Sequence, residues 1–334
     1  MKRLALCHTP TPIWHNRALD AWLGFELWVK RDDMTSGAAA GNKIRKLEYL
    51  LADALGHGAT TIITCGGAQS NHARATALLA RELGLKPVLL LRTPTPAVPP
   101  ESVGNLLLDR LVGADIRFIT PEQYRGRDQL MAEVARELSS QGERPYIIPE
   151  GGSNGIGSFG YLSAVEELAE QQSLGDLPED LDLLGFACGS GGTAAGVALG
   201  LTRFPNVARR AAAFAVCDDR AYFEDIVARI AGEVQALEPT LDAQAALGRL
   251  DIYDQFKGPA YGVPSQEQVD FVVNVARVSG LVLDLTYTGK ALFGLSHLAE
   301  RPRRALFVHT GGLPGLLAEH RLMAAAWAPG GAGS

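Results

Sequence analysis

Short apolar runs alternate with longer helical stretches along most of this chain, and that alternation restricts the fold more than any other feature. The apolar runs are rich in β-branched and aliphatic residues, as in ATTIITC (59–65) and LDLLGFAC (181–188). Between them lie Ala-, Leu- and Glu-rich segments with helical spacing, such as SNHARATALLARELGLK (70–86). Strands that alternate with helices of this length are typical of βαβ units and a parallel sheet. Because the strands are continuously apolar, we expect helices on both faces of the sheet.

The same pattern predicts five further strands, over 86–91, 114–119, 145–150, 212–218 and 304–310. It predicts further helices over 42–58 and 129–142. Pro, Gly and polar residues indicate loops at 93–103, 121–128 and 172–180. The stretch 235–260 has weak periodicity, so no element can be assigned there, and we expect the tail 328–334 to be disordered.

Length and composition limit the class of protein. The 334 residues suffice for two domains, and 47% hydrophobic against 20% charged residues predicts a substantial buried core. A net charge of -6 offers no electrostatic basis for binding nucleic acid or an anionic membrane. The absence of a signal peptide or a membrane-spanning run predicts a cytoplasmic protein. The four cysteines lie far apart without a CxxC pair, so neither a metal site nor a disulfide framework is predicted.

The first of four glycine-rich corners is SGAAAGNKIRKLEYLL (36–51), where a small-residue loop leads into a helix that starts near Asn42. Lys43 would lie in the first turn of that helix, where the helix dipole disfavours a cation. An amine with a reduced tendency to carry charge suits a Schiff-base lysine. The alternative is a solvated lysine on a K-x-x-K face that Lys43 shares with Lys46.

The second corner follows the strand at 59–65 and places three polar residues, Ser70, Asn71 and His72, at the carboxyl end of that strand. This is the usual ligand edge of an open α/β sheet. Ser70 is also a good helix N-cap. Capping and ligand binding are compatible, and both readings stay open.

The third corner is ACGSGGTAAG (187–196), again a strand, a glycine turn and a helix. Its backbone N–H groups, with the Ser190 and Thr193 hydroxyls, would form a cradle for a phosphate. The same spacing matches a dinucleotide fingerprint, in which Asp218 or Asp219 could bind the ribose. This motif alone therefore does not choose between cofactors.

The fourth corner is FVHTGGLPGL (307–316), where a strand ends at Thr310. Just upstream, Tyr287 lies in LDLTYTGKALFGL (283–295) before another helix. Taken alone, Tyr287 is best interpreted as a half-buried packing residue with its hydroxyl in water.

Seven motifs in order resemble the D-cysteine desulfhydrase / 1-aminocyclopropane-1-carboxylate deaminase family of fold-type II pyridoxal 5′-phosphate (PLP) enzymes. They are GNKIRKLEYLL (41–51), GGAQSNHAR (66–74), PEGGSN (149–154), GSGGT (189–193), PAYGVP (259–264), YTGKA (287–291) and HTGG (309–312). The resemblance implies an α/β fold of the tryptophan synthase β type, with two three-layer domains and mostly parallel sheets. It further implies a large PLP-binding domain over 1–46 and 156–334, a small inserted domain over 47–155, and a homodimer.

The family pattern also implies roles for individual residues. Lys43 would form the Schiff base with PLP and would be catalytic, together with Ser70, Tyr261 and Tyr287. The remaining cofactor ligands would be Asn71 at the 3′-oxygen, Thr310 at the ring nitrogen, and Ser190, Gly191, Gly192 and Thr193 at the phosphate. The substrate would contact Ser70, Asn71, His72, Tyr261 and Tyr287.

Within the family, three positions bear on the substrate, and all three here (His72, Thr288 and Thr310) resemble the desulfhydrases. The implied reaction converts D-cysteine to pyruvate, hydrogen sulfide and ammonia. The loop AAAGNK (38–43) and the residues Leu285 and Thr286 depart from the usual pattern near the pocket. These departures leave open an enzyme that acts on another β-substituted amino acid, by lyase or β-replacement chemistry, or on 1-aminocyclopropane-1-carboxylate.

Two other classes compete with this interpretation. A nicotinamide-dependent (NAD) oxidoreductase would use the GSGGTA fingerprint, but it leaves Lys43, Asn71 and Thr310 without a role. A non-catalytic PLP-binding protein is the other, and the complete polar set argues against it.

Overall fold

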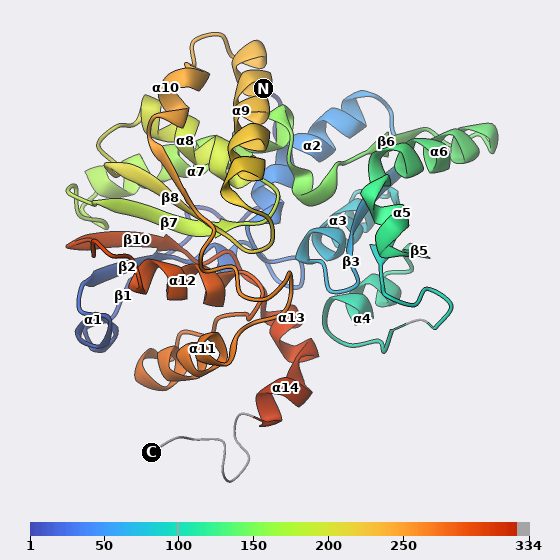
Figure 1. Ribbon diagram of the computed structural model, residues 1–334. Coiled ribbons are helices and arrows are strands. Elements are labelled where there is room, and N and C mark those ends of the chain that lie inside the picture. The colour runs from blue at the N-terminus through green and yellow to red at the C-terminus, as the bar shows by residue number, and fades with distance from the viewer. Residues whose placement is uncertain (99, 326–334) are drawn as a thin grey trace.

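Two separate β-sheets organise the structure, a computed structural model that describes residues 1–98 and 100–325 (Figure 1). The larger sheet has the strand order β1 (Ile13–His15), β2 (Glu26–Lys30), β10 (Arg304–Val308), β7 (Leu183–Cys188), β8 (Arg210–Ala215), β9 (Leu250–Tyr253). The smaller sheet has the order β5 (Asp115–Ile119), β4 (Lys86–Arg92), β3 (Thr61–Gly67), β6 (Pro145–Ile147). All strand pairs are parallel except β1 with β2, which confirms the predicted α/β class.

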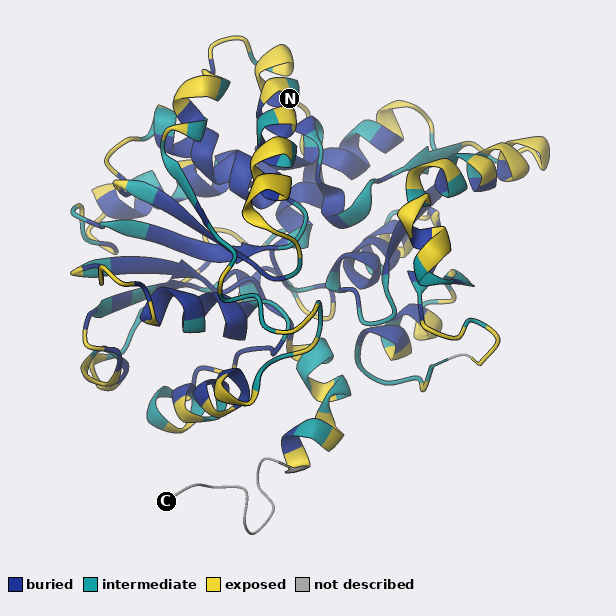
Figure 2. Ribbon diagram, viewed as in Figure 1, coloured by how far each residue is buried: buried dark blue, intermediate teal, exposed yellow. Residues whose placement is uncertain are grey.

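Helices cover both faces of the larger sheet (Figure 1). One face carries α7 (Gly155–Ser173), α8 (Gly192–Arg203), α9 (Arg220–Leu237) and α10 (Ala243–Leu247). The opposite face carries α1 (Arg17–Leu23), α11 (Gln266–Ser279) and α12 (Thr288–Ser296). Successive residues of β10 point to opposite faces, so Leu306 joins the first hydrophobic cluster and Phe307 the second. The central strands β10, β7 and β8 are therefore apolar along most of their length because both of their faces are buried, as Figure 2 shows.

The smaller sheet is covered in the same way. Ile62 packs with α2 (Lys43–Gly56) and α3 (Asn71–Glu82), while its neighbour Ile63 packs with α6 (Arg127–Ser140) on the other face. The remaining elements are α4 (Gly104–Leu111), α5 (Pro121–Arg125), α13 (Leu313–Ala318), α14 (His320–Ala325) and the 3₁₀ turns η1 (Asp32–Met34) and η2 (Glu150–Gly152). In the described part of the chain, no helix combines the length and the apolarity that a bilayer crossing requires.

The structure differs from the sequence-based expectations in several segments. The loop expected at 121–128 is helical, because Thr120 and Gln123 form a reciprocal capping box that starts α5. The strands β1, β2 and β9 were not predicted, and β9 and α10 occupy the weakly periodic stretch. The tail 328–334 lies outside the described residues.

The chain enters the smaller sheet through α2 and leaves it through η2. Helix α2 packs against α7 as well as α3, so it contacts elements from the layers of both sheets. The boundaries expected after residues 46 and 155 fall within and close to these connecting elements, and they stay a prediction.

Helix α2 lies with its backbone directly on α7. A Cβ atom at Gly160 would come within 2.3 Å of the Arg45 carbonyl oxygen and 2.7 Å of the Lys46 nitrogen. One layer further, a Cβ atom at Gly196 of α8 would come within 2.3 Å of the Ser158 carbonyl oxygen. Two glycines thus allow α2, α7 and α8 to stack closely, and this stacking determines where the first residues of α2 lie.

We predict that Gly160→Ala lowers the free energy of unfolding by about 1–3 kcal/mol, because the added methyl group overlaps the backbone of α2. Urea denaturation followed by circular dichroism measures the change. Gly232→Ala is the matched control, because Gly232 lies in α9 where an added methyl group would have no atom within 4 Å, and alanine favours a helix by up to about 1 kcal/mol. Equal effects of the two substitutions would contradict the close-stacking argument.

Candidate active site

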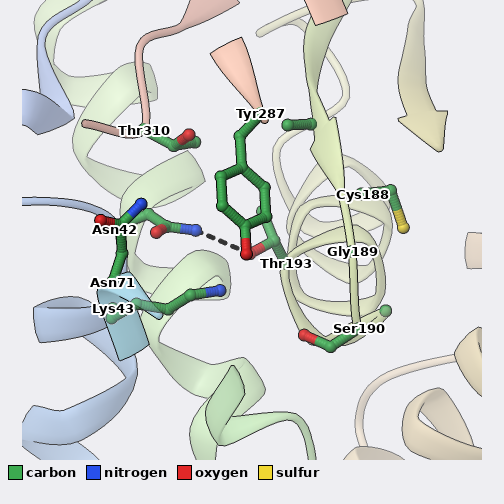
Figure 3. A pocket seen from close by; sticks show the side chains of 11 residues that line it. Asn42, Lys43, Asn71, Cys188, Gly189, Ser190, Thr193, Tyr287 and Thr310 are labelled. Atoms are coloured by element: carbon green, nitrogen blue, oxygen red, sulfur yellow. Dashed lines mark hydrogen bonds between the residues drawn. The ribbon is translucent and has the colours of Figure 1, made fainter. Parts of the chain in front are cut away.

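The predicted site residues gather around a small cavity where several segments meet. The first residues of α2, α3 and α8 reach it, together with the residue before α12 and the loop after β10 (Figure 3). The lining comprises Asn42, Lys43, Asn71, Ala187, Cys188, Gly189, Ser190, Gly191, Thr193, Tyr287 and Thr310. Residues from all four glycine-rich corners and Tyr287, which are far apart in the sequence, therefore form one site.

Lys43 is the first residue of α2, and its side chain extends into the cavity (Figure 3). Its amine makes no hydrogen bond to any described residue. Burial lowers the pKa of Lys43 to about 8, an effect that the negative charge of Glu150 partly opposes. A substantial fraction of this amine is therefore neutral near physiological pH, as a nucleophile or base requires.

A cradle of glycine residues and hydroxyl groups lies at the start of α8. Gly191 has a positive φ of 82°, and a Cβ atom at Gly192 would come within 2.7 Å of the Ser153 hydroxyl. Ser153 Oγ and Ser190 Oγ are 2.8 Å apart, and Gly192 N–H donates to Ser153 Oγ at 3.2 Å. Free N–H groups and hydroxyls at a helix N-terminus are suited to binding an anion.

Lys46 lies directly behind this cradle and is 1% exposed. Its Nζ donates to Ser153 Oγ and to the Gly151 carbonyl oxygen, both at 3.2 Å, and forms no ion pair with a described carboxylate. Burial and then the charge of Lys43 hold the pKa of Lys46 well below its usual value. An anion bound beside this buried amine would raise its pKa and so favour the protonated, positively charged form.

The opposite wall is built by the loop before Lys43 and the loop after β10. Asn42 N–H donates to the Thr310 carbonyl oxygen at 3.1 Å, and the Asn42 side chain donates to Thr193 Oγ1 at 3.4 Å (Figure 3). A Cβ atom at Gly311, whose φ is 91°, would lie 3.0 Å from Gly41 Cα. This close approach holds Thr310 and Lys43 in the same cavity.

Tyr287 forms a pair with Tyr261 through their hydroxyl groups, which are 2.6 Å apart. Burial raises the pKa of Tyr261 to about 12 and holds the pKa of Tyr287 well above its usual value. The Asp284 carboxylate accepts hydrogen bonds from the N–H groups of Tyr287 and Thr288, which holds Tyr287 at the start of α12. Tyr287 is therefore a polar member of the cavity and not a simple packing residue with its hydroxyl in water.

Tyr261 itself lines a second cavity that is larger and more open, with a volume of about 550 Å³. This cavity shares Gly189 and Ser190 with the first one, so it is continuous with the site. Arg92 lies over the ring of Tyr261, with its guanidinium carbon 5.4 Å from the ring centre. The larger cavity thus offers a route from solvent that passes the tyrosine pair.

Besides Tyr261, three predicted site residues do not line the small cavity. Ser70 caps α3 by accepting a hydrogen bond from Ala73 N–H at 3.1 Å. His72 is 3% exposed, and its Nε2 is 2.9 Å from Thr64 Oγ1, so the structure does not bring this side chain to a substrate. Burial holds the pKa of His72 well below its usual value. Gly192 does not line the cavity, and its N–H donates to Ser153 Oγ.

Sequence reasoning missed four residues that shape the site: Asn42, Lys46, Ser153 and Asp284. The signal for Lys46 was its spacing from Lys43, which places both amines on one helix face. The signal for Ser153 was the motif PEGGSN (149–154). Neither residue stands out alone, because only the fold brings Ser153 to the start of α8.

The arrangement suits a phosphorylated aldehyde cofactor. Lys43 supplies an amine that can form a Schiff base, and the cradle with Lys46 supplies partners for a phosphate. Asn71 and Thr310 add polar side chains to the lining of the same cavity.

Comparison with known proteins agrees with this chemistry. The family model described as "Pyridoxal-phosphate dependent enzyme" matches residues 4–311. A relative from Arabidopsis thaliana, the "Bifunctional D-cysteine desulfhydrase/1-aminocyclopropane-1-carboxylate deaminase, mitochondrial", is 42% identical over 326 residues, which are 93% of this chain and 78% of the relative. A "D-cysteine desulfhydrase" of Yersinia pestis (strain Pestoides F) is 39% identical over 326 residues, or 95% of this chain and 96% of the relative.

A solved structure is similar as well. The protein described as an "ACC deaminase homologue" superposes with a TM-score of 0.87 at 35% sequence identity, covering 97% of this chain and 96% of that one. The expected fold-type II architecture is thereby confirmed. The nicotinamide alternative is wrong, and Asp219, one of its two candidate ribose ligands, instead caps α9 by accepting a hydrogen bond from Tyr222 N–H.

We predict that Lys43 in the cofactor-free protein reacts with an acylating reagent along a pH profile that levels off above about pH 8, because only the neutral amine is nucleophilic. Brief labelling with acetic anhydride at a series of pH values, followed by peptide mass spectrometry, measures the profile. The exposed Lys2 in the same samples supplies the reference curve. Identical curves for the two lysines would contradict the effect of burial.

Proposed function

Since the chain belongs to the pyridoxal-phosphate dependent enzyme family and is therefore a PLP-dependent enzyme, we propose that it eliminates the β-substituent of a small amino acid, with D-cysteine as substrate. The products are pyruvate, hydrogen sulfide and ammonia. The observation that best supports this proposal is the Lys43 amine, whose pKa is about 8, in one cavity with the Tyr287 hydroxyl.

The residues of the cavity fit PLP, which when bound withdraws electrons from the substrate Cα. The proposed ligands are Lys43 at the aldehyde carbon, Asn71 at the 3′-oxygen, Thr310 at the ring nitrogen, and Ser190, Gly191, Gly192, Thr193 and Lys46 at the phosphate. Lys46 is the strongest support for a phosphate at this position, because its buried amine lacks an anionic partner among the described residues.

Lys43 would also move the proton at Cα. The Lys43 amine would act as a base when it is not bound to the cofactor, and its pKa of about 8 is close to the working pH of a cell. The backbone N–H groups of Asn71 and His72, at the start of α3, have no partner among the described residues and would hold the substrate carboxylate. Ser70 would support this contact by fixing the helix start.

The tyrosine pair would assist the leaving group. Tyr261 and Tyr287 stay protonated at neutral pH because burial raises both pKa values, so they can donate a hydrogen bond but do not serve as bases. A departing sulfur anion near the pair would accept that hydrogen bond and would take its proton from solvent. Because the two hydroxyls are hydrogen-bonded to each other, this bond strengthens the one that the pair donates.

We predict that the purified enzyme converts D-cysteine to sulfide and pyruvate in equal amounts, and that Lys43→Ala lowers turnover by about 1000-fold or more through loss of the base. Methylene-blue and lactate dehydrogenase assays quantify the two products. Formation of 2-oxobutyrate from 1-aminocyclopropane-1-carboxylate without activity on D-cysteine would assign the alternative substrate. Full activity of the Lys43→Ala variant would overturn the proposed mechanism.

We predict that Lys46→Met weakens PLP binding by about tenfold or more while Lys43 still forms its Schiff base, because a charged hydrogen bond to the phosphate is lost. Titration of the cofactor-free variant with PLP, followed by Schiff-base absorbance, gives the dissociation constant. Pyridoxal without its phosphate is the matched control, since its affinity should change little. An equal loss for both compounds would assign Lys46 a structural role.

We also propose that the enzyme is a cytoplasmic homodimer with a large domain over 1–46 and 156–334 and a small domain over 47–155. The family resemblance supports the assembly, and the two separate sheets support the division. PLP would then lie between the domains, since the cavity takes residues from the layers of both sheets. Closure of that cleft would exclude water from the reaction.

A further inference from the structure

Asn105 is a fully buried amide directly behind Asn71. It is the second residue of α4 and has no exposed surface. Its side-chain Nδ2 donates two hydrogen bonds, one to the Gln69 carbonyl oxygen and one to Asn71 Oδ1, both at 2.9 Å. Asn105 does not line the cavity, so it would contact neither the cofactor nor the substrate.

These two contacts determine which way the Asn71 amide faces. The Gln69 carbonyl oxygen can only accept a hydrogen bond, so the Asn105 atom beside it must be the Nδ2 donor. The second hydrogen of the same Nδ2 then requires an acceptor on Asn71, which is Oδ1. The Asn71 Nδ2 group is left without a partner among the described residues, on a side chain that lines the cavity.

We propose that Asn105 is a positioning residue that turns the Asn71 Nδ2 donor toward the 3′-oxygen of PLP and thereby keeps that oxygen ionised. This inference rests on the proposed function, which assigns Asn71 to the 3′-oxygen. A reversed Asn71 amide would direct a carbonyl oxygen at the 3′-oxygen, and two acceptors repel each other unless one takes up a proton.

The fold holds Asn105 in place through a reciprocal pair of contacts. Asn105 N–H donates to Gln69 Oε1 at 2.9 Å, and Gln69 Nε2 donates back to the Val103 carbonyl oxygen at 3.0 Å. Gly104 has a positive φ of 55°, and a Cβ atom there would come within 2.3 Å of the Pro314 carbonyl oxygen. Helix α4 is thus pressed between the loop before Asn71 and α13, which follows the Thr310 loop.

The ionisation of the 3′-oxygen is visible in the absorption spectrum of the holoenzyme. The Schiff base absorbs at long wavelength with the 3′-oxygen ionised and hydrogen-bonded within the ring system, and in the near ultraviolet with the neutral enol form. The spectrum therefore reports the state of this oxygen without any substrate or turnover.

The test is the variant Asn105→Leu, which keeps the branched side-chain shape and removes the Nδ2 group that donates both hydrogen bonds. We expect the ratio of the near-ultraviolet band to the long-wavelength band, measured at one pH, to rise about tenfold, and PLP affinity to fall about tenfold, since a hydrogen bond to a charged group has this magnitude. Leu106→Ala is the matched control, because Leu106 is the next buried residue of α4 and offers no polar group. Its spectrum should match that of the wild type.

A double variant separates positioning from a general structural effect. In the Asn71→Ala background, Asn105→Leu should cause no further change in the ratio of the two bands, because the amide that Asn105 orients is absent. An unchanged spectrum for Asn105→Leu, or an additive shift in the double variant, would overturn the inference. Asn105→Ala repeats the test if the leucine variant does not fold, and absence of any Schiff-base band in the wild type would instead refute the proposed function.

Discussion

The buried ion pair between Arg45 and Asp32 fixes the helix on which the whole site depends. Arg45 contacts the carboxylate through two bonds of 2.8 Å, from Nε and from Nη2, and Tyr161 donates to the same carboxylate at 2.6 Å. Breaking such a pair by removing one partner typically costs about 3–5 kcal/mol, because a charge is left buried without compensation. Together with the glycine contact at Gly160, this pair gives α2 one position and one rotation relative to α7.

That rotation divides the charges of α2 between two environments. Arg45 faces Asp32 and Glu167, and the pKa of Arg45 is held well above its usual value by these carboxylates despite the opposing effect of burial. Lys43 lines the cavity and Lys46 lies buried behind its cradle, and no described carboxylate forms an ion pair with either amine. Carboxylates of the protein therefore neutralise Arg45, while the two lysine amines have no carboxylate partner among the described residues. In the proposed function, these two amines would contact the aldehyde and the phosphate of the cofactor.

Much of the fold could be predicted from local sequence, because apolar runs and glycine corners report on the residues that carry them. All seven predicted strands exist in the structure. The edge strand β1 has only three residues, too few for a periodic pattern, and it depends on β2 for its pairing. Helix α7 is buried along most of its length, so it lacks the polar face by which a surface helix is recognised. Sequence reasoning therefore identified neither element.

The candidate site divides in the same way. Lys43, Asn71, Ser190 and Thr310 could be named from their corners, because each follows or opens an element with a recognisable boundary. The supporting residues Lys46, Ser153 and Asn105 could not, because their roles depend on side chains brought together by the packing of α2, α4 and α8. A polar residue that acts through another residue leaves no local pattern.

The difference between residues that line the cavity and residues that support the lining indicates which of them can discriminate between substrates. Of the three positions by which the sequence resembles the desulfhydrases, only Thr310 lines the cavity. Thr288 is fully buried, and its hydroxyl donates a hydrogen bond to the Asp284 carboxylate, which also accepts one from the Tyr287 N–H. The His72 side chain is hydrogen-bonded to Thr64. The side chains of these two residues can influence a substrate only through the tyrosine and the helix start that they support. Discrimination between a β-thiol and a cyclopropane ring must then come from Thr310, from the tyrosine pair, and from the shape that the supporting residues give to both.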